Sequence, residues 1–282
     1  MNPFTLNIEG RLIKIDKPIV MGIVNVTPDS FYADSRTQTA DDIRRQVDKH
    51  IQEGATIIDL GGYSSRPGAD EVSVDEEYRR LARGLEVIRK DYPSVIVSID
   101  TFRADVARKC VKEWNANIIN DISGGDLDRE MWDIIAELKV PYILMHMRGT
   151  PQTMQSDCLY EDVTADVLFD LSKKISQLHQ LGINDIIVDP GFGFAKNLDQ
   201  NYQLMAELTA LQSLNKPILV GISHKSMIYK LLQTTPQESL NGTTILNTIA
   251  LLNGAAILRV HDVKEAVEAI EIVDKIKTSS LY

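Results

Sequence analysis

The run PIVMGIVNV at residues 18–26 and the run ATIIDLGG at residues 55–62 stand on either side of a segment with helical periodicity. Both runs are short, nearly continuously apolar and rich in β-branched residues, as in strands that are buried on both faces. The segment between them has an N-cap candidate at Thr39, apolar residues at four-residue spacing from Ile43, and a stop signal at Gly54. This strand–helix–strand unit predicts a parallel sheet.

The same unit recurs along the whole chain. Six further apolar runs occupy residues 95–100, 117–122, 141–146, 185–189, 216–222 and 255–261. The last is followed by a helical pattern that begins at Asp262, with Glu265 three residues later. Eight parallel strands close on themselves, so the alternation predicts a (β/α)8 TIM barrel; an open, doubly wound sheet is the alternative.

Two shorter segments precede the barrel pattern. Residues 4–8 and 11–15 alternate in polarity around Glu9 and Gly10, which predicts an N-terminal β-hairpin that caps one end of the barrel. No composition shift, linker or low-complexity stretch divides residues 1–282, and α/β barrels commonly reach this length, so we expect a single domain.

Composition excludes several classes of protein. With 30 Lys+Arg against 40 Asp+Glu, a net charge of −10 and no basic stripe, the chain does not resemble a nucleic-acid-binding protein. Only Cys110 and Cys158 are present, which argues against a disulfide framework or a zinc cluster and favours a reducing compartment. The N-terminus mixes charged with apolar residues, unlike a signal peptide, and no apolar run approaches ~18 residues. We therefore expect a cytoplasmic protein that does not contact membranes.

Every predicted strand ends in polar residues, and the active sites of TIM barrels lie at the carboxyl ends of their strands. The strand-end residues are Asn25, Asp59, Asp100, Asn120 with Asp121, His146, Asp189, Ser223 with Lys225, and Arg259 with His261. Any one of them has an equally good structural explanation as a helix cap or turn former. Their presence at all eight ends favours a binding site.

Individual motifs leave alternatives open. Asn25 in NVTPDSF is suited to ligate a hard cation such as Mg²⁺ or to cap a turn. GGYSSRPG at residues 61–68 combines backbone freedom, two hydroxyls and Arg66, which suits a phosphate but also occurs in ordinary loops. Arg259 and His261 end the last strand just before a helix, the recurrent phosphate site of this fold, and there binding is favoured over a surface salt bridge.

Lys225 follows GISH at the end of the seventh run and has three explanations. It is a solvated lysine, a helix-start residue, or a Schiff-base lysine that would make the protein an aldolase-like barrel. His146 and His224 are open between a hydrogen-bonded and a catalytic role, although a lone histidine is more often hydrogen-bonded in place than catalytic. The residues alone do not decide among these.

Taken together in order, the strand-end motifs resemble the dihydropteroate synthase family of the folate pathway. The matching segments are NVTPDSF from Asn25, DLGGYSSRPG from Asp59, SIDT from Ser98, INDISGG from Ile119, LMHMRGTPQTMQ from Leu144, VDPGFGF from Val188, VGISHKS from Val220 and RVHD from Arg259. A single motif such as RVHD is weak, but the ordered set spans nearly the whole chain and is therefore specific.

The resemblance implies a transferase that joins (7,8-dihydropterin-6-yl)methyl diphosphate to 4-aminobenzoate with release of pyrophosphate, uses Mg²⁺, forms a homodimer through outer helices late in the chain and is a sulfonamide target. It also implies a role for each matching position. The pterin ligands would be Asp100, Asn120, Asp189 and Lys225; the diphosphate ligands Ser65, Arg66, Arg259 and His261; the metal ligand Asn25; and the border of the 4-aminobenzoate pocket Pro67, Phe194, Lys225 and Ser226. Lys225, Asp100, Arg259 and His261 would be the catalytic set.

These roles agree with elementary chemistry. A carboxylate such as Asp189 accepts the paired N–H donors of a pterin edge, and a cation such as Lys225 donates to its carbonyl. Loss of diphosphate leaves a cation that water would quench, so we expect residues 27–38 and 63–73 to act as closing loops. An arylamine is neutral and nucleophilic at pH 7, so no strong general base is needed.

The sequence departs from the usual family pattern around the ligands. Ser65 stands where Thr is usual, Tyr63 replaces a common acidic residue, His224 stands where Arg is frequent, and YADSRTQT follows NVTPDSF in place of a Gly-rich turn. Three competing functions are a pterin-dependent methyltransferase of the same barrel family, a non-catalytic pterin-binding protein and a Schiff-base aldolase. The first would not need the diphosphate pocket of Arg66, Arg259 and His261, which is intact here.

Overall fold

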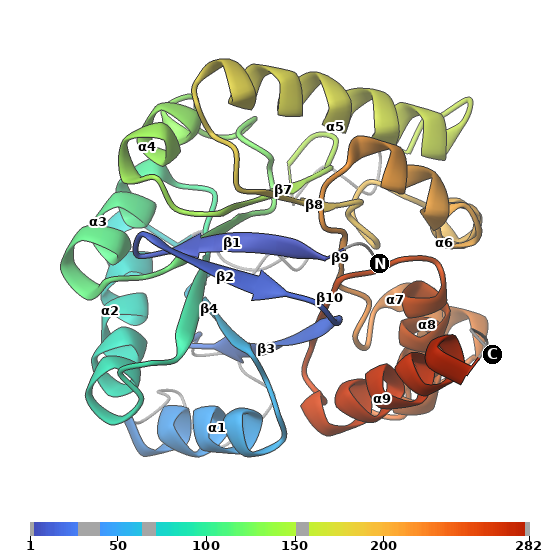
Figure 1. Ribbon diagram of the computed structural model, residues 1–282, viewed down its shortest axis with the longest axis horizontal. Helices are drawn as coiled ribbons and strands as arrows, with labels where there is room; N and C mark the ends of the chain where they lie inside the picture. Colours follow the sequence, from blue (N-terminus) through green and yellow to red (C-terminus); the bar gives the residue numbers. More distant parts are fainter. Residues whose placement is uncertain (1–2, 28–39, 64–71, 151–157, 280–282) are drawn as a thin grey trace.

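Eight parallel strands stand side by side in a ring in this computed structural model, which describes residues 3–27, 40–63, 72–150 and 158–279 (Figure 1). Their order is β8-β7-β6-β5-β4-β3-β10-β9. The two edges meet at a parallel bridge between Val188 and Ile218, where the Val188 N–H donates to the Pro217 carbonyl at 2.9 Å. The sheet is thus a nearly closed barrel, as predicted, and the open-sheet alternative is wrong.

Each predicted run contains one barrel strand. The strands are β3 (Ile19–Asn25), β4 (Ile57–Gly61), β5 (Ile96–Asp100), β6 (Ile118–Asp121), β7 (Tyr142–Met145), β8 (Ile186–Asp189), β9 (Leu219–Val220) and β10 (Ile257–Val260). The prediction of a strand over residues 216–222 was wrong in extent, because only two of those residues form β9. Pro217 lacks an N–H, so it contributes only its carbonyl to the ladder.

Helices alternate with the strands and form the outer layer of the barrel (Figure 1). They are α1 (Ala40–Gln52), α2 (Val74–Asp91), α3 (Ala104–Trp114), α4 (Met131–Leu138), α5 (Val163–Gln180), α6 (Leu198–Ala206), the 3₁₀ segment Leu208–Leu214, α7 (Ser226–Leu231), α8 (Leu240–Leu252) and α9 (Val263–Ser279). Ile43 and Val47 of α1 are buried, and the chain turns at Gly54 with φ +100°. The N-cap predicted at Thr39 lies outside the described residues.

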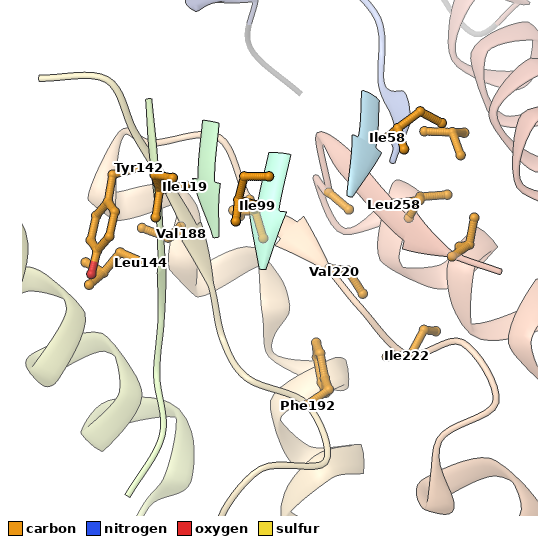
Figure 2. Packing of buried hydrophobic residues seen from close by; sticks show 14 of the residues in the cluster. Ile58, Ile99, Ile119, Tyr142, Leu144, Val188, Phe192, Val220, Ile222 and Leu258 are labelled. Atoms are coloured by element: carbon orange, nitrogen blue, oxygen red, sulfur yellow. The ribbon is translucent and has the colours of Figure 1, made fainter. Parts of the chain in front are cut away.

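The apolar core has two large parts and a small third cluster of Ile122, Met145, Met147 and Ala195. The larger part lies between the outward faces of the strands and the helices, and Figure 2 shows Ile58, Ile99 and Leu258 among its members. The smaller part fills the interior of the barrel. Its strand residues are Met21, Ile57, Ile118, Ile143, Ile187, Leu219 and Ile257. The strands are therefore buried on both faces, which explains their continuous apolar runs.

A two-stranded antiparallel hairpin, β1 (Phe4–Ile8) and β2 (Arg11–Ile15), lies across the ring of strands in Figure 1. Glu9 and Gly10 both have positive φ angles, 52° and 79°, which is the turn geometry that matches strand twist in a two-residue hairpin. Leu6 and Ile8 pack into the interior cluster. The predicted hairpin is confirmed, and it covers the amino end of the barrel while the carboxyl end carries the polar side chains.

The Cys110 thiol is buried on α3, and Cys158 is half-buried. In the part of the chain that the structure describes, no helix is both long enough and apolar enough to cross a bilayer.

Candidate functional site

Strand alternation puts polar side chains directly above the apolar interior. In β5, Ile96 packs against the interior cluster, and Ser98 and Asp100 follow on the same face at two-residue intervals. In β4, Ile57 is followed in the same way by Asp59, which pairs in register with Ser98. The carboxyl end of the barrel therefore has an acidic layer enclosed by the strands.

Arg259 of β10 joins this acidic layer. Its Nε donates to Asp59 Oδ2 at 2.6 Å, and its Nη2 donates to Asp100 Oδ2 at 2.6 Å. Asn120 Nδ2 donates to the same Asp59 oxygen at 3.2 Å. One guanidinium and one amide thus tie together strands β4, β5, β6 and β10 in a single polar network.

The charges of this network depend on one another. Burial raises the pKa of Asp100, the Arg259 guanidinium acts against that shift, and the neighbouring Asp59 adds to it. The two carboxylates in turn raise the pKa of Arg259 above its ordinary value, although burial opposes this. A ligand that attracts Arg259 would therefore leave Asp100 a weaker acid, and a cationic ligand would keep it ionised.

A second cluster lies at the ends of β8 and β9. Asp189 is buried, and its Oδ1 accepts the Gly191 N–H at 2.7 Å. The Lys225 Nζ donates to the Phe192 carbonyl at 2.5 Å and lies 4.6 Å from the centre of the Phe194 ring. Burial lowers the pKa of Lys225 to about 8, although Asp189 opposes the shift, and burial likewise raises the pKa of Asp189.

The two histidines at the last strands have different environments. His261 Nδ1 lies 3.0 Å from Ser223 Oγ, which also accepts the His261 backbone N–H. His224 Nδ1 faces the Pro236 carbonyl at 2.6 Å, and its Nε2 faces Asp262 Oδ2 at 2.6 Å. Both ring nitrogens of His224 therefore face acceptors, which favours the imidazolium form.

Asn25 ends β3 beside Gly61 and Asp100. Its Oδ1 lies 3.3 Å from the point where a Cβ on Gly61 would stand, and Asp100 Oδ2 lies 3.8 Å from that point. Amide and carboxylate oxygens from neighbouring strands suit a hard cation such as Mg²⁺. Among the described residues no three His, Cys, Asp or Glu side chains gather as a metal cluster.

The structure brings most of the predicted site residues to one end of the barrel. Asn25, Asp100, Asn120, Asp189, Phe194, Lys225, Arg259 and His261 end barrel strands or follow them directly, and Ser226 begins α7. Ser65, Arg66 and Pro67 lie outside the described residues, as do most residues of the two predicted closing loops. Asp121 points elsewhere: it accepts hydrogen bonds from Tyr142, Ser123 and Gly125 and so stabilises a turn.

Sequence reasoning missed two buried residues. Asp59 was recognised as a strand-end carboxylate but received no role, although it is the partner of Arg259 Nε. Lys196 was not singled out, yet it is 3% exposed and its Nζ contacts three acceptors at the end of β8. The signal for Asp59 was its two-residue offset from Ile57, whereas nothing local indicated that Lys196 points inward.

A family model described as pterin binding enzyme matches residues 21–261. A curated relative from Escherichia coli strain K12, named dihydropteroate synthase, is 44% identical over 268 residues, which is 94% of each chain. A relative of the same name from Synechocystis is 40% identical over 258 residues, covering 90% of this chain and 89% of its own.

Solved structures give the same result. A Yersinia pestis dihydropteroate synthase in complex with a sulfonamide drug superimposes with a TM-score of 0.91 at 39% identity, covering 98% of this chain and 100% of its own. A Xanthomonas albilineans dihydropteroate synthase with 4-aminobenzoic acid superimposes with a TM-score of 0.88 at 36% identity, covering 97% and 98%.

Proposed function

The chain belongs to the dihydropteroate synthase family of pterin-binding enzymes, and from that membership we propose the reaction that its site performs. It joins (7,8-dihydropterin-6-yl)methyl diphosphate to 4-aminobenzoate in folate biosynthesis and releases pyrophosphate. The observation that carries this proposal is the meeting of the half-buried Arg259 guanidinium with the buried Asp59 and half-buried Asp100 carboxylates at the barrel end, since the reaction must stabilise an anionic leaving group beside a cationic ring. A methyltransferase or a non-catalytic pterin binder is not favoured.

We propose that the pterin binds between Asp100, Asn120, Asp189 and Lys225. Asp189 is buried and accepts the Gly191 N–H, so its carboxylate is held in place to accept the paired N–H donors of the ring. Lys225 contacts the same turn through the Phe192 carbonyl, and we expect its ammonium to donate to a ring carbonyl as well. Asp189 ends β8 and Lys225 is the N-cap residue of α7, so both lie at the carboxyl end of the barrel.

The diphosphate end of the site is proposed to consist of Arg259, His261, Ser65 and Arg66. Arg259 already has two anionic partners, so a diphosphate would compete with Asp59 and Asp100 for the guanidinium. Transfer of Nη2 from Asp100 to the diphosphate would release the Asp100 carboxylate toward the ring. Asp59, bound to Nε, would keep the guanidinium in position during this exchange.

Bond cleavage then follows from these charges. The C–O bond breaks with its electron pair leaving on the diphosphate oxygen, and the resulting methylene cation is conjugated with the pterin ring. The amine nitrogen of 4-aminobenzoate forms the new C–N bond and loses one proton to the departing pyrophosphate or to water. Asp100 favours the cationic ring, and Arg259 and His261 favour the departing anion. Mg²⁺, held through the Asn25 amide oxygen, would further stabilise negative charge on the diphosphate when it is bound.

For 4-aminobenzoate, we propose a pocket bordered by Phe194, Pro67, Lys225 and Ser226. The ring of Phe194 lies beside the Lys225 ammonium, so an aromatic carboxylate finds an apolar face next to a cation. The Xanthomonas relative is described with 4-aminobenzoic acid and the Yersinia relative with a sulfonamide drug, which supports competition of sulfonamides with 4-aminobenzoate at this pocket.

The decisive experiment is pyrophosphate release from pterin diphosphate, measured with and without 4-aminobenzoate and with and without Mg²⁺. The proposal expects release that depends on both additions and a product with the mass of 7,8-dihydropteroate. Tight pterin binding without pyrophosphate release would overturn it in favour of a binding protein.

We also propose a homodimer through the late helices. Ile245, Ile249 and Leu252 form an exposed apolar stripe on α8, and Ile272 and Ile276 form another on α9, which packs beside α8 in Figure 1. Ile249→Glu is expected to convert dimers to monomers in sedimentation experiments. Phe169→Glu on α5, an exposed apolar residue away from this face, is the matched control, and a monomeric wild type would contradict the proposal.

A cytoplasmic location is proposed because the sequence has only two cysteines, unlike a disulfide-rich secreted protein, which suits a reducing compartment. Fractionation of cells that express the full chain, with the activity recovered in the cytoplasmic fraction, would test it.

A further inference from the structure

Lys196 is a buried cation that the proposed reaction does not use. It is 3% exposed, and its Nζ lies 3.0 Å from the Gly191 carbonyl, 3.0 Å from the Phe194 carbonyl and 3.1 Å from His146 Nδ1. An ammonium has three N–H donors, and here each has an acceptor. A carbonyl only accepts, and the lone pair at His146 Nδ1 requires a neutral ring, which agrees with a pKa of His146 held below its ordinary value by burial.

The turn that Lys196 contacts has an unfavourable backbone of its own. Gly191 and Gly193 have φ angles of +71° and +80°, and Ala195 has a φ of +48°. A Cβ on Gly191 would stand 2.0 Å from the His146 carbonyl oxygen. Positive φ is costly for alanine, so this conformation needs bonds from outside the turn. The Nζ of Lys196 supplies two of them.

The same turn carries groups that face the substrate pocket. The Phe192 carbonyl accepts from Lys225 Nζ at 2.5 Å, and the Phe194 ring lies 4.6 Å from that Nζ. Lys196 binds the carbonyl of Phe194 itself. The position of the Phe194 ring relative to Lys225 therefore depends on the hydrogen bond from Lys196 Nζ to the Phe194 carbonyl.

We infer that Lys196 is a positioning residue for the 4-aminobenzoate pocket: it holds the 191–194 turn so that Phe194 and Lys225 meet the aromatic substrate in a fixed geometry. This inference rests on the proposed function. Asp189 belongs to β8, so its strand sets its position, although its carboxylate also accepts the Gly191 N–H of this turn. We therefore expect the 4-aminobenzoate side of the site, which includes Phe194, to depend on Lys196 more than the pterin side does.

The pKa of Lys196 lies close to neutral pH. Burial lowers the pKa of Lys196 to about 7, Asp189 acts against the shift, and Lys225 and Arg148 add to it. Loss of this proton would leave Nζ with two N–H donors for three acceptors. Methionine is similar in length to lysine but has no charge and no donor, so Lys196→Met removes these hydrogen bonds with little change in side-chain size.

The test compares Lys196→Met with wild type in steady-state kinetics of both substrates. We expect KM for 4-aminobenzoate to rise at least 10-fold, with KM for pterin diphosphate changed less than 3-fold. The matched control is Lys174→Met: Lys174 is also a buried lysine, with a side chain 7% exposed, but it pairs with Asp126 and Asp170 away from the turn. The control is expected to change neither KM more than 2-fold.

Equal changes in both KM values, or no change in either, would overturn the inference. If Lys196→Met does not fold, His146→Ala removes one acceptor of the ammonium and leaves the turn intact; it should raise KM for 4-aminobenzoate about 3-fold, and no rise would overturn the inference. Wild-type enzyme that releases no pyrophosphate would refute the proposed function, whereas active wild type without the KM split refutes only the role of Lys196.

Discussion

Arg259 Nη2 donates to Asp100 Oδ2 at 2.6 Å, although 159 positions separate the two residues in the chain. The bond joins the last strand of the barrel to its third strand. It joins Arg259, which we propose as a diphosphate ligand, to Asp100, which we propose as a pterin ligand. We therefore expect the diphosphate and the pterin ring of the substrate to contact the same ion pair. Asp59, which is fully buried, lies with its Oδ2 at 2.6 Å from both Nε and Nη2 of the same guanidinium.

Asp59→Asn is expected to destabilise the protein, because it removes one charge of a buried ion pair and leaves Arg259 with Asp100 alone. Breaking such a pair costs about 3 kcal/mol of unfolding free energy. Urea denaturation measures it. Ser98→Ala is the control, since Ser98 is the register partner of Asp59 and its buried Oγ has no hydrogen-bond partner in the described part of the chain. Equal losses in the two variants would contradict this role of Asp59.

Arg259→Ala is expected to weaken binding of pterin diphosphate roughly 30-fold or more, which corresponds to about 2 kcal/mol at 1.4 kcal/mol per factor of ten. Binding of the free hydroxymethyl pterin, which lacks the diphosphate, should fall much less. Calorimetry with the two ligands measures both. If affinity for the diphosphate survives and affinity for the free pterin is what falls, Arg259 does not bind the diphosphate.

Lys225→Ala is expected to lower kcat/KM roughly 10²-fold or more, because a charged hydrogen bond at a transition state is worth about 3 kcal/mol. We expect the lysine to act as a hydrogen-bonding cation, in keeping with its donation to the Phe192 carbonyl. Steady-state kinetics measure the loss, and borohydride treatment in the presence of substrate is the control for a Schiff base. Covalent trapping of substrate on Lys225 would show that this role is wrong.

His224→Gln is expected to lower stability at acidic pH and not at alkaline pH. The hydrogen bond to Asp262 raises the pKa of His224 above 6.5, so the stabilisation is fully present below pH 6.5 and is lost as the pH rises through the folded-state pKa. We expect the wild-type advantage to be about 1 kcal/mol at pH 5.5 for this half-buried pair.

Urea denaturation of wild type and His224→Gln between pH 5.5 and pH 9 measures this advantage. His179→Gln is the control, because burial and the neighbouring Lys216 lower the pKa of His179 and give no such stabilisation in acid. A wild-type advantage that stays constant over the whole range would disprove the ionic origin of the His224–Asp262 contact.

The sequence alone determined the barrel and the end of it that carries the site. Strand periodicity and helix spacing are local properties, so the runs around Met21, Ile57 and Ile257 were sufficient to predict eight buried strands. Parallel strands end at the same edge, so Asp100, Asn120, Asp189 and Lys225 were expected together without knowledge of any contact. The ordered motifs then indicated the family.

Only the tertiary structure decided which of these groups touch. The bond of Arg259 to Asp59 and Asp100 depends on the stagger between strands of a closed barrel, which no local pattern records. The short β9 depends on the meeting of the barrel edges at Val188 and Ile218. Lys196 follows a glycine-rich turn in a polar stretch and would be expected in solvent; it is buried because the turn folds back over His146, whose ring nitrogen and neighbouring carbonyls satisfy its charge.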